Sequence, residues 1–437
     1  MAAIVENWGP ERVLPGRSAI GETGRVALVL ASLLGVLVVI RAAGVTTLLA
    51  WTLPVIEDAR YPLLFAAYFA TWWFARRASG DARRTALLGG SIATAAIFDA
   101  TFLALSLVWI CGLHLLLRRW WVALAYVVAT YVIAVVACNR AWYAVDPLVA
   151  RWGYLLAVSY TFRVAWLLHE RRLHPETDVE LADVVVYFVF APFFVIVPYM
   201  IAIPRFDRFC AGLERHDLAV ERSGIRMIAW GIVLSGATWA VRELYGPSAL
   251  GLASLAHGDY AMGFVHGFFS YMLEHLLLAL AIASVLVGMV RVLGIDLGPS
   301  FDQPLRSQSI TEWWRRWNTH FRDLLVELFY YPVVMRLRRR RKLAVVLGCV
   351  AVFLVGSTLF HWPNHIMKRG TPTFPIGVFA ESLVMCPLVA VALVRNREAP
   401  PRGLAHRALR IFVTLLLVYI AVVIVGRGVQ RAVLGQP

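Results

Sequence analysis

The sequence predicts an all-α polytopic membrane protein with about eleven transmembrane helices and one amphipathic interfacial helix. Hydrophobic residues make up 60% of the 437 residues and charged residues only 16%. The mean hydropathy is +0.69, which lies far from the balance of soluble domains. Apolar runs recur at bilayer length, about 20 residues each. No repeat, low-complexity tract or linker divides the chain, so we expect a single membrane-embedded domain over residues 1–437.

The predicted elements begin after a short charged tail over residues 1–25, which a retained first helix follows. Apolar runs then occupy residues 26–50, 61–75, 85–98, 100–117, 120–139, 152–168, 184–204, 227–241, 276–290, 343–360, 374–394 and 411–426. We expect the Gly- and His-containing stretch 244–273 to be partly inserted.

Two features modify the predicted helices. Arginine-rich loops flank the pair of short runs 85–98 and 100–117. Because basic loops favour the cytoplasmic side, this pair predicts a helical hairpin with Asp99 at its tip. Pro192 and Pro198 predict kinks that neighbouring helices tolerate.

The charge balance fits the same class of protein. The formal net charge is +15, from 42 Lys and Arg against 27 Asp and Glu. In a membrane protein this excess is typical of cytoplasmic loops that contact anionic membrane lipids, so we expect no nucleic-acid partner. The five cysteines are scattered without metal-binding spacing, and we expect no metal site.

The apolar pattern stops between residues 300 and 342. Ser309 and Glu312 have the spacing of a capping box, which predicts a helix that begins there and runs toward Pro332. Its apolar stripe, at spacings of three and four, consists of Trp313, Trp317, Phe321, Leu324 and Leu328, and its polar stripe of Arg315, Asn318 and Arg322. This pattern indicates an amphipathic helix in the plane of the membrane interface. Six cations between residues 336 and 342 then mark a cytoplasmic loop.

His361 ends the next uncharged run, 343–360, and Pro363 predicts that the helix stops or kinks there. An ionisable side chain in a membrane helix suggests a function. Three interpretations remain open from the pattern alone. His361 can simply hydrogen-bond a neighbour, pair with His365 as a metal ligand, or act as a general base.

Four stretches resemble motifs of the membrane-bound O-acyltransferase (MBOAT) family, in the same order. Val158–Arg163 is similar to the family's SFYTF segment and Ile201–Phe209 to its AGPIxRYxxF turn. Gly288–Ile295 with Gln303-Pro304 is similar to the GxARLLGI helix and NFxxP loop. Ser309–Asp323 with Tyr331-Pro332 matches SITEFWRRWHxSLxxxxRDYxYxPL nearly position by position. The chain thus resembles a bacterial member of the family, with an MBOAT-like catalytic core over residues 154–394.

The resemblance implies an α-helical membrane enzyme that transfers an acyl group from a thioester to a hydroxyl. The family's invariant histidine and the polar residue that ends its RRW motif match His361 and Asn318. Acyl transfer needs a base for the hydroxyl proton and a donor for the carbonyl oxygen, and these two side chains suit those catalytic roles. No bound cofactor is expected. Acyl-CoA, in particular acetyl-CoA, or an acyl-carrier thioester is the expected co-substrate.

The residues around Asn318 are the expected binding site for donor or substrate. They are Arg315, Arg316, Trp317, His320, Arg322 and Asp323. The arginines can hold phosphate groups of coenzyme A or the acidic face of an acyl-carrier protein, although a solvated or lipid-facing role remains open.

The chain also departs from the family pattern. Asn318 stands where many bacterial members have the histidine of RRWH, and the glycines of GLWHG around His361 are missing. The FSGYSD stretch is replaced by Ala281–Ser284. These differences leave the acceptor type open.

The leading hypothesis is a multi-pass enzyme of the bacterial inner membrane that moves an acyl group, most plausibly acetyl, to a hydroxyl of an envelope polysaccharide, glycan or lipid. A periplasmic or extracellular transferase is a further expected partner. One alternative is a transporter or flippase that uses the buried Arg163, Glu274 and Glu381. The other is a catalytically inactive MBOAT-like scaffold.

Overall fold

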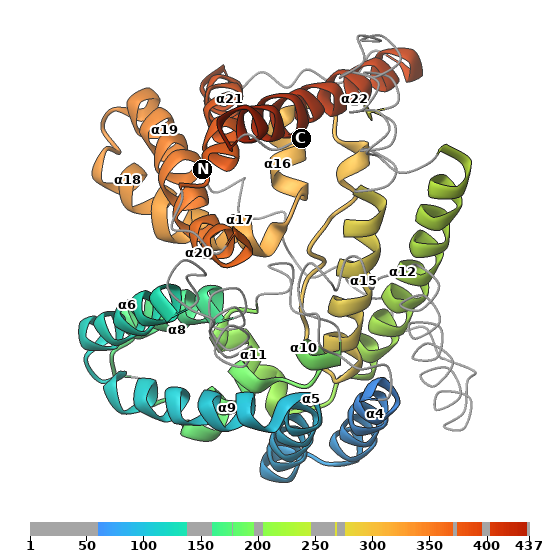
Figure 1. Cartoon of the computed structure of the whole chain (residues 1–437), viewed down its shortest axis with the longest axis vertical. Coiled ribbons are helices and arrows are strands. Elements are labelled where there is room, and N and C mark those ends of the chain that lie inside the picture. The colour runs from blue at the N-terminus through green and yellow to red at the C-terminus, as the bar shows by residue number, and fades with distance from the viewer. Residues whose placement is uncertain are drawn as a thin grey trace.

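The computed structural model is entirely helical over the residues that it describes (Figure 1). These residues are 60–137, 160–176, 178–195, 204–245, 267–268, 276–369, 374–395 and 403–434. The all-α prediction is therefore confirmed for this part of the chain. The predicted first span 26–50 and most of the stretch 244–273 lie outside it.

Among the first described helices, Asp99, which the sequence places at the tip of a helical hairpin, lies at a kink. Helix α4 (Tyr61–Arg77) packs against α5 (Gly80–Leu116), and α6 (Trp120–Ala137) follows. Asp99 has extended dihedral angles, φ −164° and ψ 110°, and its carboxylate accepts a hydrogen bond of 2.8 Å from the backbone N–H of Phe102. The aspartate therefore ends one half of α5 and caps the other. Which side of the membrane the flanking arginines face stays a prediction.

Of the two prolines that predict kinks, Pro198 lies outside the described residues, and at Pro192 the structure shows an interruption between two helices in place of a kink. Helix α9 (Leu181–Val189) ends there and a short α10 (Pro192–Val195) follows. The guanidinium of Arg163 donates to the backbone carbonyl groups of Tyr187 and Phe188, at 3.1 and 2.6 Å. These carbonyls lie in the last turn of α9, where a helix lacks its own donors. The buried arginine therefore closes a helix end.

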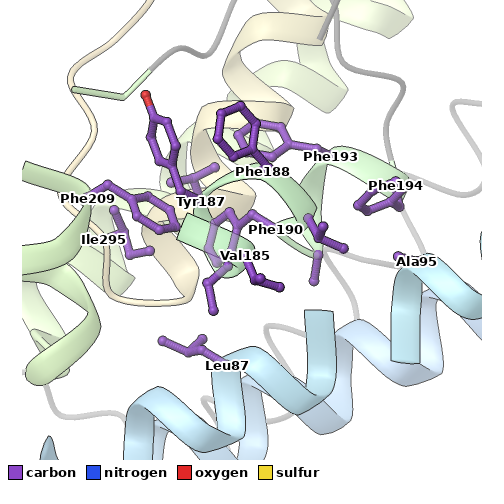
Figure 2. Close-up of a cluster of buried hydrophobic side chains, with 14 of the residues drawn as sticks. Leu87, Ala95, Val185, Tyr187, Phe188, Phe190, Phe193, Phe194, Phe209 and Ile295 are labelled. Carbon is purple, nitrogen blue, oxygen red and sulfur yellow. The ribbon is translucent and has the colours of Figure 1, made fainter. Parts of the chain in front are cut away.

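The core around this break is rich in aromatic side chains (Figure 2). Phenylalanines from α9, α10 and α11 (Phe206–Glu214) meet Leu87 and Ala95 of α5. Phe190 and Phe209 pack edge to face, with ring centroids 5.0 Å apart. Edge-to-face contacts add to the stabilisation from burial alone. This cluster fixes the half of the molecule that carries the first two motif stretches.

Helices α12 (Leu218–Tyr245) and α15 (Leu276–Val292) run side by side (Figure 1). A Cβ atom added to Gly288 would lie 2.7 Å from the carbonyl oxygen of Gly224, and the reverse distance is 2.6 Å. The two backbones therefore approach too closely for any side chain at these positions. Such small-residue contacts are typical of membrane helix pairs.

The segment after residue 309 is not the single amphipathic helix that the sequence predicts. The structure divides it into α16 (Ile310–Arg316), α17 (Thr319–Leu325), a π-helical segment η6 (Val326–Tyr330) and α18 (Tyr331–Arg336). The prediction of one continuous helix is wrong because the chain turns at Asn318. Its polar stripe does not form one solvated face either, because Arg322 is buried whereas Arg315 is exposed.

The helix that carries His361 is longer than predicted. Helix α19 (Arg341–Val350) continues through a π-helical segment η7 (Ala351–Ser357) into α20 (Thr358–Arg369). The prediction of a stop at Pro363 is wrong. Pro363 removes only one backbone hydrogen bond, and membrane helices tolerate that loss.

The last described helices complete the second half of the molecule. They are α21 (Ile376–Arg395), α22 (Leu404–Tyr419), the π-helical segment η8 (Ile420–Arg427) and α23 (Gly428–Leu434). Their buried side chains join those of α16, α17 and α19 in a second core cluster.

Four helical stretches among the described residues are long and apolar enough to cross a membrane, and three shorter apolar helices accompany them. The four are Gly80–Leu116, Arg341–Trp362, Ile376–Arg395 and Leu404–Gln430. This composition supports a multi-pass membrane protein. The total of about eleven spans stays a prediction.

Candidate active site

The capping box at the start of α16 is confirmed. The hydroxyl of Ser309 accepts a hydrogen bond of 3.1 Å from the backbone N–H of Glu312. The Glu312 carboxylate reaches back to the backbone N–H of Gln308, at 2.8 Å, one residue earlier than the usual partner. Glu312 also pairs with Arg316, at 2.7 Å. Arg316 therefore helps to fix the start of this segment.

Asn318 lies at the turn between α16 and α17 in a left-handed conformation, with φ 41° and ψ 61°. Asparagine tolerates this region better than most residues. Its side chain caps α17, because Oδ1 accepts a hydrogen bond of 3.4 Å from the backbone N–H of Phe321. A backbone N–H can only donate, so the capping atom is the oxygen. The two N–H groups of Nδ2 are thereby left as the donors of this side chain.

His361 lies in the first turns of α20, and its Nδ1 is 2.7 Å from the backbone oxygen of Ser357. A carbonyl oxygen can only accept, so Nδ1 carries the hydrogen in this contact. In a neutral imidazole with its hydrogen on Nδ1, the basic lone pair lies on Nε2. The helix thus selects the tautomer in which Nε2 can act as a base.

Phe321 connects the two candidate catalytic residues. Its backbone is capped by Asn318, and its ring packs edge to face against His361, with centroids 5.3 Å apart. Phe162 stacks on Phe360 at 5.2 Å and contacts Phe321 at 5.4 Å. The aromatic cluster therefore brings the first motif stretch, the RRW segment and the histidine together.

The second motif stretch joins this assembly through Arg205. Its guanidinium lies 5.1 Å from the ring centroid of Trp166 and 3.6 Å from the carboxylate of Glu327 in η6. Burial raises the pKa of Glu327, and the charge of Arg205 opposes that shift. The contact ties the loop before α11 to the segment that follows the RRW motif.

A cavity of about 140 Å³ lies close to the histidine, although neither His361 nor Asn318 is among its lining residues. Most of its lining residues are apolar, but polar atoms make up nearly as much of its wall as apolar atoms do. The lining residues are Trp313, Trp314, Trp317, Phe353, Met385, Val418 and Val422, with the polar residues Ser357, Glu381 and Ser382. Ser357, whose carbonyl group orients His361, therefore connects the cavity wall to the imidazole.

The other predicted binding residues divide into two groups. Trp317 lines the cavity and stacks on Trp313, with ring centroids 5.0 Å apart. Arg315 is exposed. These two and Arg316 remain available for the predicted roles.

His320, Arg322 and Asp323 take part in internal contacts instead. His320 is buried, with Nε2 at 2.9 Å from the Gly298 carbonyl oxygen and Nδ1 at 3.3 Å from the Ser300 hydroxyl. Arg322 donates to Asp323 and to the backbone carbonyl of Arg315. These groups hold the turn in shape, so we assign them a positioning role.

Sequence reasoning missed two features of this site. The Ser357 contribution is a backbone carbonyl, which leaves no side-chain signal. Glu381 was considered only for the transporter alternative, although it lines the cavity that Ser357 also lines. Among the described residues, no group of three His, Cys, Asp or Glu side chains gathers to hold a metal ion.

Comparison with known proteins supports an O-acyltransferase at a coarse level. No family model matches the chain. The chain is similar to probable long-chain-alcohol O-fatty-acyltransferase 8 of Arabidopsis thaliana, 28% identical over 127 residues, which are 28% of this chain and 38% of the relative. Acyltransferase 2 of the same plant is 27% identical over 149 residues, 32% of this chain and 42% of the relative. The chain thus matches less than half of the length of these relatives.

Proposed function

We propose that this protein is a membrane-embedded O-acyltransferase that moves an acyl group from a thioester donor to a hydroxyl group of a lipid or glycan acceptor. The observation that supports it most is the hydrogen bond from Nδ1 of His361 to the Ser357 carbonyl, because it leaves Nε2 as a base. The names of the plant relatives favour the same reaction class.

In the proposed step, Nε2 of His361 takes the proton of the acceptor hydroxyl while the oxygen attacks the thioester carbon. The N–H groups of Asn318 donate to the carbonyl oxygen as it gains negative charge. When the tetrahedral intermediate collapses, the C–S bond breaks and the thiolate takes the proton back from the imidazolium. The products are an ester and a free thiol, and His361 returns to its starting tautomer.

The donor and acceptor follow from less specific features. Acyl-CoA is the donor that we propose, with an acyl-carrier protein as the other thioester source. The relatives' names favour a lipid acceptor, and most of the residues that line the cavity are apolar. O-acetylation of an envelope polysaccharide in a bacterial inner membrane, completed by a periplasmic transferase, is the finer form of the leading hypothesis.

The test compares cells that express the wild-type chain, His361→Ala or His365→Ala at matched membrane levels. Base-labile esters on extracted lipids and envelope glycans are measured by mass spectrometry. We expect an added acyl mass with wild type and His365→Ala, since His365 is the matched histidine one turn further along α20, and its loss in His361→Ala. The mass increment identifies the acyl group, so it separates acetylation from fatty acylation. Equal ester levels in wild type and His361→Ala would contradict the proposal.

A further inference from the structure

Glu381 is a carboxylate in the wall of the cavity that Ser357 also lines. Three tryptophans, Trp313, Trp314 and Trp317, form another part of the same wall. Glu381 is half-buried, and a carboxylate that is partly removed from water is unfavourable unless it has polar partners. The proposed transfer step uses His361 and Asn318 and gives this carboxylate no task.

The position of Glu381 is fixed by close helix packing. A Cβ atom added to Gly377 would lie 2.7 Å from the carbonyl oxygen of Gly426, so α21 and η8 approach closely one turn before Glu381. The neighbouring Arg427 of η8 interacts electrostatically with Glu381. Because Arg427 places a positive charge near this carboxylate, the cavity suits a neutral hydrogen-bond donor better than a second cation.

The cavity wall also relates the Glu381 carboxylate to His361, the proposed base of the acyl transfer. Ser357 lines the cavity, and its carbonyl group holds His361, which follows four residues later. One helical turn rises about 5.4 Å. A molecule that lies in the cavity and also reaches past Ser357 to the imidazole would present a different part of itself to Glu381.

We propose that Glu381 accepts a hydrogen bond from a second hydroxyl of the acceptor, so that the substrate is a polyhydroxylated amphiphile with a glycerol- or sugar-like head and an apolar chain. This inference rests on the proposed acyltransferase function and goes beyond it by naming the acceptor class. A simple long-chain alcohol leaves the carboxylate without this partner. Sites built to bond a substrate hydroxyl discriminate strongly against analogues that lack it.

The experiment uses the full chain in lipid nanodiscs with palmitoyl-CoA and two acceptors, 1-O-hexadecylglycerol and 1-hexadecanol. The measured quantity is the ratio of kcat/KM for the two acceptors. We expect the wild type to favour 1-O-hexadecylglycerol at least tenfold, and Glu381→Gln to lower that ratio about tenfold. Glu214→Gln makes the same chemical change at an exposed carboxylate of α11 and should keep the wild-type ratio.

Arg427→Gln separates recognition from simple charge pairing. If Glu381 served only to neutralise Arg427, both variants would lower kcat/KM for the two acceptors equally and the ratio would not change. That result, or a wild-type ratio near one, would overturn the inference.

A binding measurement separates this inference from the proposed function. If the wild type transfers no acyl group to either acceptor, the proposed function fails in this assay. Thermal unfolding with and without 1-O-hexadecylglycerol still tests Glu381. Stabilisation of the wild type that Glu381→Gln loses supports the acceptor class, and equal or absent stabilisation of the two proteins contradicts it.

Discussion

The imidazole of His361 stands edge to face against the ring of Phe321, with centroids 5.3 Å apart and planes at 81°. The ring orientation of a catalytic base decides whether Nε2 faces the acceptor. Nδ1 holds the imidazole at one edge through Ser357, and Phe321 limits its rotation. Two contacts from different elements therefore define a single orientation.

Phe321→Leu should loosen this orientation. We expect kcat to fall about 10- to 100-fold, because misplacement of a catalytic group by about 1 Å costs up to about 10²-fold. Phe329→Leu is the matched control, since Phe329 also packs on Phe360, at 6.2 Å. Steady-state kinetics of the two variants check this prediction. A similar loss of kcat in both variants would contradict this prediction, because the whole aromatic cluster, and not the contact of Phe321 with His361, would then cause the effect.

Asn318 has a structural role as a helix cap and a proposed catalytic role, and two substitutions separate the two. Asn318→Asp keeps an oxygen that caps α17 but removes the N–H donors. We expect near-normal thermal stability and a loss of about 10²- to 10³-fold in kcat. Asn318→Ala should lose the same activity and also about 1 kcal/mol of stability with the cap. An Asp variant with wild-type kcat would exclude the donor role.

Ser309→Ala should destabilise the start of α16 by about 1 kcal/mol, because it removes the acceptor for the Glu312 N–H. Ser79 is the matched control, since it also precedes a helix, α5, but makes no side-chain capping bond. Hydrogen exchange of the α16 peptide measures the effect. Exchange should accelerate in Ser309→Ala and stay unchanged in Ser79→Ala, and equal exchange at α16 in both would contradict the capping role.

Gly288→Ala should force α12 and α15 apart, because the new Cβ would lie 2.7 Å from the Gly224 carbonyl oxygen. Overpacking of this kind costs about 1–3 kcal/mol. Gly236→Ala in α12 is the control, since nothing lies within 4 Å of its added Cβ. Thermal unfolding in detergent should show a lower midpoint only for Gly288→Ala. A lowered midpoint in both variants would point to a general intolerance of added methyl groups.

Features that depend on neighbours in the sequence were predicted best. The capping box of Ser309 and Glu312 is confirmed. The irregular backbone at Asp99 and the interruption before Pro192 lie where the sequence predicts a hairpin tip and a kink, because both follow from local backbone chemistry. The apolar runs likewise identify membrane-length helices, because their composition alone makes them incompatible with water.

Tertiary contacts explain the features that local sequence rules predicted wrongly. The helix breaks at Asn318 because the backbone N–H of Thr319 bonds the Ser300 carbonyl, at 2.8 Å, and its hydroxyl bonds the Pro299 carbonyl, at 2.7 Å. These partners lie about 20 residues away, beyond the reach of any helical pattern. Arg322 is buried for a similar reason, since the new turn offers it a carbonyl partner.

The sequence by itself determined that this chain has the composition of a helical membrane protein, where several of the described helices lie, and which histidine and asparagine are the candidate catalytic residues. Only the tertiary structure decided that Phe321 links these two residues, that Ser357 selects the tautomer of His361 and that Glu381 lines the adjacent cavity. The physical reason is the distance along the sequence over which each interaction acts. Capping and hydrophobicity act within a few residues, whereas a site is formed by side chains that packing brings together from distant helices.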